Sequence, residues 1–435
     1  MLADFQQHIQ DDFPELLQKH FLLACSGGVD SMVLTALCKT LKLDFAIAHC
    51  NFQLREEASV ADAEFVKKIA EKYKIKYYVI DFDTDSYVIK NKVSVQVAAR
   101  ELRYAWFAEI MQQNGIEIMV TAHHADDNLE TFLINLSRGT GIEGLNGIPA
   151  KNDPIYRPLL PFSRAQIEAY AATEQIDWRE DASNKETKYL RNKIRHDIVP
   201  LLKTLHPTFL ENFNKTQEHL AGTSDFLKAT IEKSRNTLFI NKEGLVTISI
   251  ADLQELYPQK TILYELFKDY GFTAWNDIFG LLTASSGKEV RSKTHRLVKD
   301  RNTLLLTKLA TVTKRAYTIE ALETEMNNPI RLRFEEVSAI GQPSANALYV
   351  DKETLKYPLT VRKWENGDYF YPLGMQGKKK LSKYFKDEKI DIITKENQWL
   401  LCSENDLVWV VGRRGDERFK VTEHTKNIVK ITFNK

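Results

Sequence analysis

The sequence predicts an α/β protein with three parts: an N-terminal doubly wound parallel sheet, a mainly helical domain, and a small α+β domain at the C-terminus. Between Phe21 and about Arg138, short apolar runs alternate with amphipathic helical patterns. Such alternation produces βαβ units, which build a parallel sheet covered by helices on both faces. After Pro161 the pattern becomes helical and charged, and from about Ala347 β-type segments are broken by Gly and Pro.

Four apolar runs of strand length lie in the first part: FLLACSG, DFAIAHCN, YYVIDF and EIMVTAHH. Amphipathic stretches separate them. In a sheet of this kind, ligands bind beyond the carboxyl ends of the strands. We therefore expect one site to be formed by the segments that directly follow strands: residues 26–31, 49–55 and 123–130.

Domain boundaries follow from the length and from these changes of pattern. The 435 residues exceed what one hydrophobic core normally serves. A helix that begins after Ser163 leads into a periodic, charged stretch, and strand-like runs such as LVTISI return from about Leu238. We predict domains over residues 1–205, 206–325 and 326–435.

The composition is that of an ordinary globular protein, with 43% hydrophobic and 27% charged residues and a formal net charge of +1. The acidic N-terminus and the lack of a long apolar run argue against a signal peptide and a membrane-spanning helix. We therefore expect a cytoplasmic protein with no membrane partner. The four cysteines form no C-x-x-C pair, so neither a zinc site nor a disulfide framework is predicted.

The first motif is SGGVDS at residues 26–31, between a strand and a helix. Two glycines allow close backbone approach, and free N–H groups at the start of the helix form an anion site suited to phosphates. No Lys occupies the position that a Walker A loop requires, so pyrophosphate is the more natural ligand. Asp30 would repel phosphate unless Mg²⁺ lay between them. The alternative is a tight turn that uses Gly for its conformation alone.

This motif resembles the signature of the N-type ATP pyrophosphatases, the PP-loop enzymes with an adenine nucleotide alpha hydrolase-like fold. The resemblance implies ATP as co-substrate, Mg²⁺ held by Asp30 through the nucleotide, and pyrophosphate as a product. It assigns ATP binding to Ser26, Gly27, Gly28, Val29, Asp30 and Ser31.

The second motif, AHCNFQLR at residues 48–55, resembles the A-H-x-N-H-x-L-R stretch of the lysidine synthetase family and departs from it at Phe52. His49 and Asn51 stand at a strand end. There they either face the nucleotide or are polar residues satisfied within the fold. The resemblance favours a role in ATP binding for both.

The third motif, ARELRY at residues 99–104, places Arg100 and Arg103 on nearly one face of a helix. That spacing suits either a salt-bridged surface or an anion clamp. The family pattern A-R-x-x-R-Y implies that Arg100 contacts the nucleotide or the acceptor. Arg100 thus joins Asp30 and Asp127 as a predicted catalytic residue.

The most specific motif is TAHHADDNLET at residues 121–131. His123, Asp127 and Glu130 have i, i+4, i+7 spacing on a helix, which suits either a metal site or an acidic face for a cationic amine. The motif matches the lysidine synthetases, and the resemblance implies that Asp127 and Glu130 bind the ammonium group of a lysine substrate. Arg138 at the end of this helix is assigned to the lysine carboxylate or a phosphate; the alternative is an ordinary helix terminus.

Three further elements resemble the same family: R-P-L-L at 157–160, D-x-S-N at 181–184 and R-N-x-x-R at 191–195. Arg191 and Arg195 form an i, i+4 basic pair on a helix. Such a pair either lies on a solvated face or contacts RNA or ATP, and the resemblance favours the contact.

The tail between Lys356 and Lys389 is rich in lysine, with aromatic residues interleaved. This composition is able to contact phosphates and to stack on unpaired bases, although charge runs are usually solvated. The stretch resembles the C-terminal module of the longer lysidine synthetases. tRNA binding is therefore assigned to Arg191, Arg195, Lys378, Lys379 and Lys380.

Together the resemblances cover nearly the whole chain and imply a two-step reaction. ATP adenylates the C2 carbonyl oxygen of the wobble cytidine in the CAU anticodon of tRNA(Ile), releasing pyrophosphate. The ε-amine of lysine then displaces AMP. The expected partners are tRNA(Ile) and lysine, with a homodimer as one candidate assembly.

Three alternatives share parts of these features. A tRNA 2-thiolase is disfavoured because the chain has no cysteine pair or cluster spacing. A small-molecule PP-loop ligase would not need the basic, aromatic tail. A catalytically silent RNA-binding protein would not need intact Asp30, Asp127 and Glu130.

Overall fold

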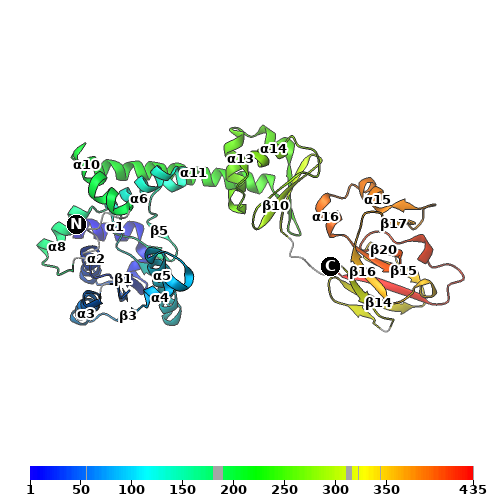
Figure 1. Ribbon diagram of the computed structural model, residues 1–435, viewed down its shortest axis with the longest axis horizontal. Coiled ribbons are helices and arrows are strands. Elements are labelled where there is room, and N and C mark those ends of the chain that lie inside the picture. Colours follow the sequence, from blue (N-terminus) through cyan, green and yellow to red (C-terminus); the bar gives the residue numbers. More distant parts are fainter. Residues whose placement is uncertain (55, 180–189, 310–315, 322, 343, 435) are drawn as a thin grey trace. The chain divides into compact units, whose positions relative to one another are not determined.

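A computed structural model of the chain (Figure 1) describes residues 1–54, 56–179, 190–309, 316–321, 323–342 and 344–434. The chain divides into two compact units, Met1–Ala229 and Thr230–Lys435. The long helix α11 (Phe209–Leu238) belongs to both. None of the described helices is long and apolar enough to cross a membrane.

Six strands form the sheet of the first unit, in the order β3–β2–β1–β4–β6–β5. All neighbours pair in parallel except β5 and β6. The order reverses between β1 and β4, so the carboxyl ends of these two strands flank the crevice where ligands of such sheets bind. The strands are β1 (Phe21–Ala24), β2 (Phe45–Asn51), β3 (Tyr77–Asp81), β4 (Ile118–Val120), β5 (Lys151–Asn152) and β6 (Ile155–Tyr156).

Helices cover both faces of this sheet, as the predicted doubly wound fold requires. Successive side chains of β1 point to opposite faces. Phe21 and Leu23 join a core with α1 and α2, while Leu22 joins a second core with Phe107 and Ile110 of α5. The helices are α1 (Leu2–Asp12), α2 (Val29–Thr40), α3 (Glu56–Tyr73), α4 (Thr84–Asn91), α5 (Val95–Asn114), α6 (Ala125–Arg138), α7 (Ile142–Leu145), α8 (Arg164–Thr173), α9 (Leu190–Lys193), the π-helix η3 (Ile194–Ile198) and α10 (Val199–Thr204).

The middle of the chain is helical, as predicted, and also carries a five-stranded antiparallel sheet in the order β7–β8–β11–β10–β9. Its helices after α11 are α12 (Ile250–Glu255), α13 (Gln259–Phe267) and α14 (Trp275–Leu281). Its strands are β7 (Ile240–Lys242), β8 (Leu245–Ser249), β9 (Glu289–Arg291), β10 (His295–Asp300) and β11 (Thr303–Lys308). The domain boundaries at residues 205 and 325 stay predictions.

Two four-stranded sheets, β12–β16–β19–β20 and β13–β14–β21–β15, share one core at the C-terminus. Leu359 and Trp409 of the first sheet pack with Leu332 and Ile431 of the second. The predicted α+β C-terminal part is thus confirmed. Its elements are β12 (Ala316–Ile319), β13 (Glu325–Met326), β14 (Arg331–Val337), β15 (Ala347–Asp351), β16 (Leu359–Lys363), β17 (Tyr369–Phe370), β18 (Lys379–Lys380), α15 (Leu381–Asp387), α16 (Ile392–Asn397), β19 (Trp399–Ser403), β20 (Asp406–Val410) and β21 (Ile428–Asn434).

Candidate active site

The SGGVDS loop joins β1 to α2 and is closed by its own serines. Gly27 has φ +87°, a left-handed conformation that favours glycine. The Ser31 hydroxyl accepts from Gly27 N (3.2 Å) and donates to Gly28 O (2.9 Å). Ser26 Oγ lies 3.3 Å from Ser31 Oγ, whereas Val29 is buried in the core and anchors the helix start. Gly28 N donates to Ser26 Oγ at 3.4 Å, so in this structure the backbone N–H groups of both glycines are bound by serines of the loop, at the amino end of α2 where anions bind.

Asp30, on the first turn of α2, has two differently placed carboxylate oxygens. Oδ2 accepts from Arg164 Nη1 at 2.7 Å. Oδ1 lies 3.6 Å from His124 Nε2 and, among the described residues, is buried without a hydrogen-bond partner. Burial raises the pKa of the Asp30 carboxyl. A buried carboxylate oxygen lacking a donor is a suitable ligand for a hard cation such as Mg²⁺.

The part of the chain that the structure describes contains no group of three His, Cys, Asp or Glu side chains able to hold a metal. A cation at Asp30 would therefore depend on oxygens of a bound nucleotide for further ligands. This agrees with how Mg²⁺ usually binds, through one or two carboxylates together with substrate phosphates.

His124 separates Asp30 from Asp127 at the junction of β4 and α6. Its Nε2 lies 3.4 Å from Asp127 Oδ2, and its backbone N donates to the same oxygen at 3.2 Å. Burial favours a higher pKa for Asp127, but His124, His123 and the arginines nearby outweigh it and hold that pKa below its ordinary value. Asp127 is therefore an anion at neutral pH.

Glu130 is buried one turn further along α6, with 1% of its surface exposed. Arg191 Nε donates to Oε2 at 2.9 Å, and Arg195 Nε donates to Oε1 at 2.6 Å. Arg195 Nη2 also reaches Asp127 Oδ1 at 3.1 Å. The structure thus joins the two predicted lysine-binding acids to the two arginines predicted to bind tRNA.

Asp126 is a further buried acid in this motif. Its Oδ2 accepts from the backbone N of Arg164 at 2.8 Å, and its Oδ1 pairs with Lys203. The sequence motifs predicted no role for Asp126, His124, Arg164 or Lys203. Arg164 follows the helix-capping Ser163, but a capped helix start gives no signal that its first residue reaches Asp30.

His49 and Asn51 at the end of β2 are satisfied within the fold. His49 Nδ1 lies 2.9 Å from Cys25 O, and burial lowers the pKa of this histidine. Asn51 Nδ2 donates to Asp81 Oδ1 at 2.8 Å. These contacts match the structural alternative, and ATP binding by these two residues stays a prediction.

Among the described residues, two predicted arginines form no ion pair with Asp30 or Asp127, whose partners are His124, Arg164 and Arg195. Arg100 is exposed on α5, with its guanidinium 4.9 Å from the centre of the Tyr104 ring. Arg138 ends α6, about 16 Å along the axis from Asp127 at 1.5 Å per residue. Their roles toward acceptor and lysine stay predictions.

Three family models match separate parts of the chain: the PP-loop domain over residues 1–202, the TilS substrate binding domain over 241–309, and the TilS substrate C-terminal domain over 359–431. A tRNA(Ile)-lysidine synthase from Parabacteroides distasonis is 41% identical over 418 residues, covering 95% of each chain. The chain belongs to the tRNA(Ile)-lysidine synthase family. A second member, from Bacteroides thetaiotaomicron, is 36% identical and covers 97% of each chain. The 2-thiolase alternative is not favoured.

The C-terminal domain of this lysidine synthase family member carries the predicted lysine cluster. Lys378, Lys379 and Lys380 line a pocket of about 400 Å³ together with Lys383. Lys379 Nζ is paired with Asp387 at 2.8 Å, whereas Lys378 Nζ lies 4.3 Å from the centre of the Tyr369 ring. The three predicted lysines therefore have different surroundings.

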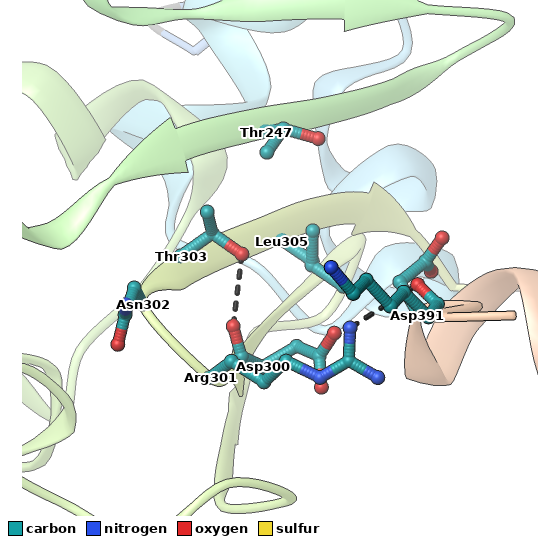
Figure 2. Close-up of a pocket in the computed structure, with 8 residues that line it drawn as sticks. Thr247, Asp300, Arg301, Asn302, Thr303, Leu305 and Asp391 are labelled. Carbon is teal, nitrogen blue, oxygen red and sulfur yellow. Dashed lines mark hydrogen bonds between the residues drawn. The ribbon is translucent and has the colours of Figure 1, made fainter. Parts of the chain in front are cut away.

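A second pocket of about 400 Å³ lies at the β10–β11 turn (Figure 2). Arg301 Nη1 donates to Lys389 O at 3.1 Å, and Asp300 and Asp391 face the same space. Its lining carries charges of both signs and none of the predicted site residues. Arg55 and the D-x-S-N element at 181–184 lie outside the described residues.

Proposed function

We propose that this chain converts the wobble cytidine of the CAU anticodon of tRNA(Ile) into lysidine. ATP adenylates the C2 carbonyl oxygen and pyrophosphate leaves; the lysine ε-amine then attacks and AMP leaves. A carbonyl oxygen is a poor leaving group until it is activated, which is why ATP is needed. The observation that carries the proposal is 41% identity to a curated tRNA(Ile)-lysidine synthase over 95% of both chains.

The PP loop is proposed to hold ATP. The phosphates would replace the serine oxygens as acceptors for the N–H groups of Gly27 and Gly28, and the Ser26 and Ser31 hydroxyls would then donate to them at the start of α2. Asp30 would hold Mg²⁺ through its unpartnered Oδ1. Bound there, the ion would offset negative charge on the phosphates.

Asp127 is proposed as the direct contact of the lysine ammonium. Its side chain is 15% exposed, while Glu130 is nearly inaccessible and already binds two guanidinium groups. Glu130 would then act indirectly, by fixing Arg195 beside Asp127. Arg138 is proposed to bind the lysine carboxylate, and Arg100 the nucleotide or acceptor.

The tRNA is proposed to contact Lys378, Lys379 and Lys380 of the C-terminal domain. Arg191 and Arg195 would contact RNA only with the nitrogens that their carboxylate partners leave accessible. Because tRNA is the substrate, the proposed site of action is the cytoplasm. Light scattering on a sizing column, with and without tRNA, would decide between a monomer and a homodimer.

The test incubates the protein with ATP, Mg²⁺ and radiolabelled lysine. The acceptor is either tRNA(Ile) with CAU or its variant with U at the wobble position. We expect acid-precipitable label on the first tRNA alone, and its loss in Asp30→Ala. Absence of label on both tRNAs, with pyrophosphate released in the presence of another acceptor, would refute lysine as the second substrate.

A further inference from the structure

We propose that Arg164 is a positioning residue for the activation step: it fixes the Asp30 carboxylate by one oxygen and leaves the other for a divalent cation. This inference rests on the proposed ATP-dependent function. The two residues are 134 positions apart in the sequence and lie on α8 and α2.

The guanidinium of Arg164 is held by two carboxylates. Nη1 donates to Asp30 Oδ2 at 2.7 Å, and Nε donates to Glu168 Oε1 at 2.6 Å, one turn along α8. A planar guanidinium bound at two points has little rotational freedom, so it constrains the carboxylate that it contacts. Asp30 Oδ2 is thereby occupied, whereas Oδ1 is buried with no donor among the described residues.

The backbone of Arg164 is anchored as firmly as its side chain. Its N–H donates to Asp126 Oδ2 at 2.8 Å, and Asp126 is itself buried and paired with Lys203. Ser163 caps the helix start with its hydroxyl accepting from Gln166 N at 3.2 Å. A metal ligand such as Asp30 keeps a productive orientation when the residues that contact it are themselves fixed by hydrogen bonds. Arg164 is fixed in this way.

Arg164 could instead bind a phosphate of ATP directly. Two nitrogens of its guanidinium already donate to carboxylates, which favours the positioning role. The two roles differ in one measurable respect. A positioning residue affects the part of ATP affinity that depends on the metal, whereas a direct phosphate contact affects ATP affinity with and without metal.

The experiment measures ATP binding to the full-length protein by calorimetry, once with Mg²⁺ and once with EDTA. For Arg164→Ala we expect the gain in affinity produced by Mg²⁺ to fall about tenfold, the size of one charge-assisted hydrogen bond, with the metal-free affinity unchanged. Arg164→Lys should restore part of the gain in affinity produced by Mg²⁺, because lysine keeps the positive charge but lacks the planar guanidinium that donates in two directions. Glu168→Gln, the matched control, removes the charge of this exposed partner but keeps an amide oxygen able to accept from Arg164 Nε, so it should behave as wild type.

Equal loss of affinity with and without Mg²⁺ would overturn the inference in favour of a direct phosphate contact. No change in either condition would overturn it as well. If thermal melting shows that Arg164→Ala does not fold, the test uses Arg164→Lys and compares it with Glu168→Gln. The measured quantity is again the gain in ATP affinity produced by Mg²⁺. Failure of the wild type to bind ATP would refute the proposed function instead.

Discussion

Arg195 binds the carboxylate of Glu130 through two guanidinium nitrogens, with Nε 2.6 Å from Oε1 and Nη2 3.0 Å from Oε2. Glu130 is almost fully buried, whereas the side chain of Arg195 is 33% exposed. Arg191 contributes one hydrogen bond to Oε2, at 2.9 Å. A buried carboxylate is costly unless paired, so the fold of this region depends on Arg195 more than on Arg191.

Arg195→Ala should therefore lower the free energy of unfolding by about 2 kcal/mol, less than for a fully buried pair because Arg195 is partly exposed and Arg191 remains. Arg191→Ala is the matched comparison and should cost less than half as much. Urea denaturation of both variants measures the difference. Equal destabilisation by the two changes would contradict this ranking.

Asp127→Asn and Glu130→Gln should separate substrate binding from structure. Asp127→Asn removes the proposed ammonium contact, so we expect the KM for lysine to rise about tenfold or more. It also removes the negative charge beside Arg195 and His124, so we expect a moderate loss of stability, smaller than in Glu130→Gln because Asp127 is less buried than Glu130. Glu130→Gln leaves two arginines facing a neutral amide, so it should lower stability. Lysine incorporation at varied lysine concentration, with melting curves, provides both readouts. The proposed roles would be reversed if Asp127→Asn left the KM for lysine unchanged while Glu130→Gln raised this KM and kept wild-type stability.

Stability should depend on pH through His123. Burial lowers the pKa of His123 to about 4, below its value in an unfolded chain of about 6.5. Between these two pH values the unfolded state binds more protons than the folded state. The stability that the neutral His123 contributes is therefore fully present above about pH 6.5 and is lost as the pH falls toward 4. The loss is at most about 3 kcal/mol. Unfolding at pH 7 and pH 4.5 tests this. His123→Asn should flatten the dependence; an unchanged profile would show that other groups cause it.

Gly27→Ala should be far more damaging than Gly28→Ala. Gly27 has φ +87° and its added Cβ would lie 3.2 Å from Val66 Cγ2, whereas Gly28 has φ −75°. The left-handed conformation costs a non-glycine residue about 1–2 kcal/mol, before any steric contact. We expect lower stability and weaker ATP binding for Gly27→Ala. Similar stability of the two variants would show that the turn adapts.

The lysines of the C-terminal cluster should contribute unequally to tRNA binding, according to whether each is already paired with a carboxylate. Lys380→Ala should weaken tRNA binding and reduce the slope of log affinity against log salt by about one, as for one phosphate contact. Lys379 is only 20% exposed and is paired with Asp387, so Lys379→Ala should change the slope less. Filter binding at several salt concentrations measures both. A larger slope change for Lys379→Ala than for Lys380→Ala would show that the Lys379–Asp387 ion pair breaks when RNA binds.

The alternation of apolar runs and helical patterns was sufficient to predict the parallel sheet, the helices on both faces, and the placement of SGGVDS and TAHHADDNLET at strand ends. These features depend on side-chain periodicity and on glycine conformations, which act over a few residues. The motifs also sufficed to predict the family. The same local pattern could not tell whether His49 and Asn51 face a ligand, since their partners Cys25 and Asp81 lie directly after β1 and at the end of β3.

What only the tertiary structure decided is which charges meet. Arg195 lies 65 residues from Glu130, and Arg164 lies 134 residues from Asp30. Nothing in the i, i+4 spacing of Arg191 and Arg195 distinguishes a solvated pair from one that turns toward a buried acid. Such pairs form because η3 packs on α6 and α8 packs on α2, which brings their faces together and excludes water. Burial then makes each carboxylate require a partner.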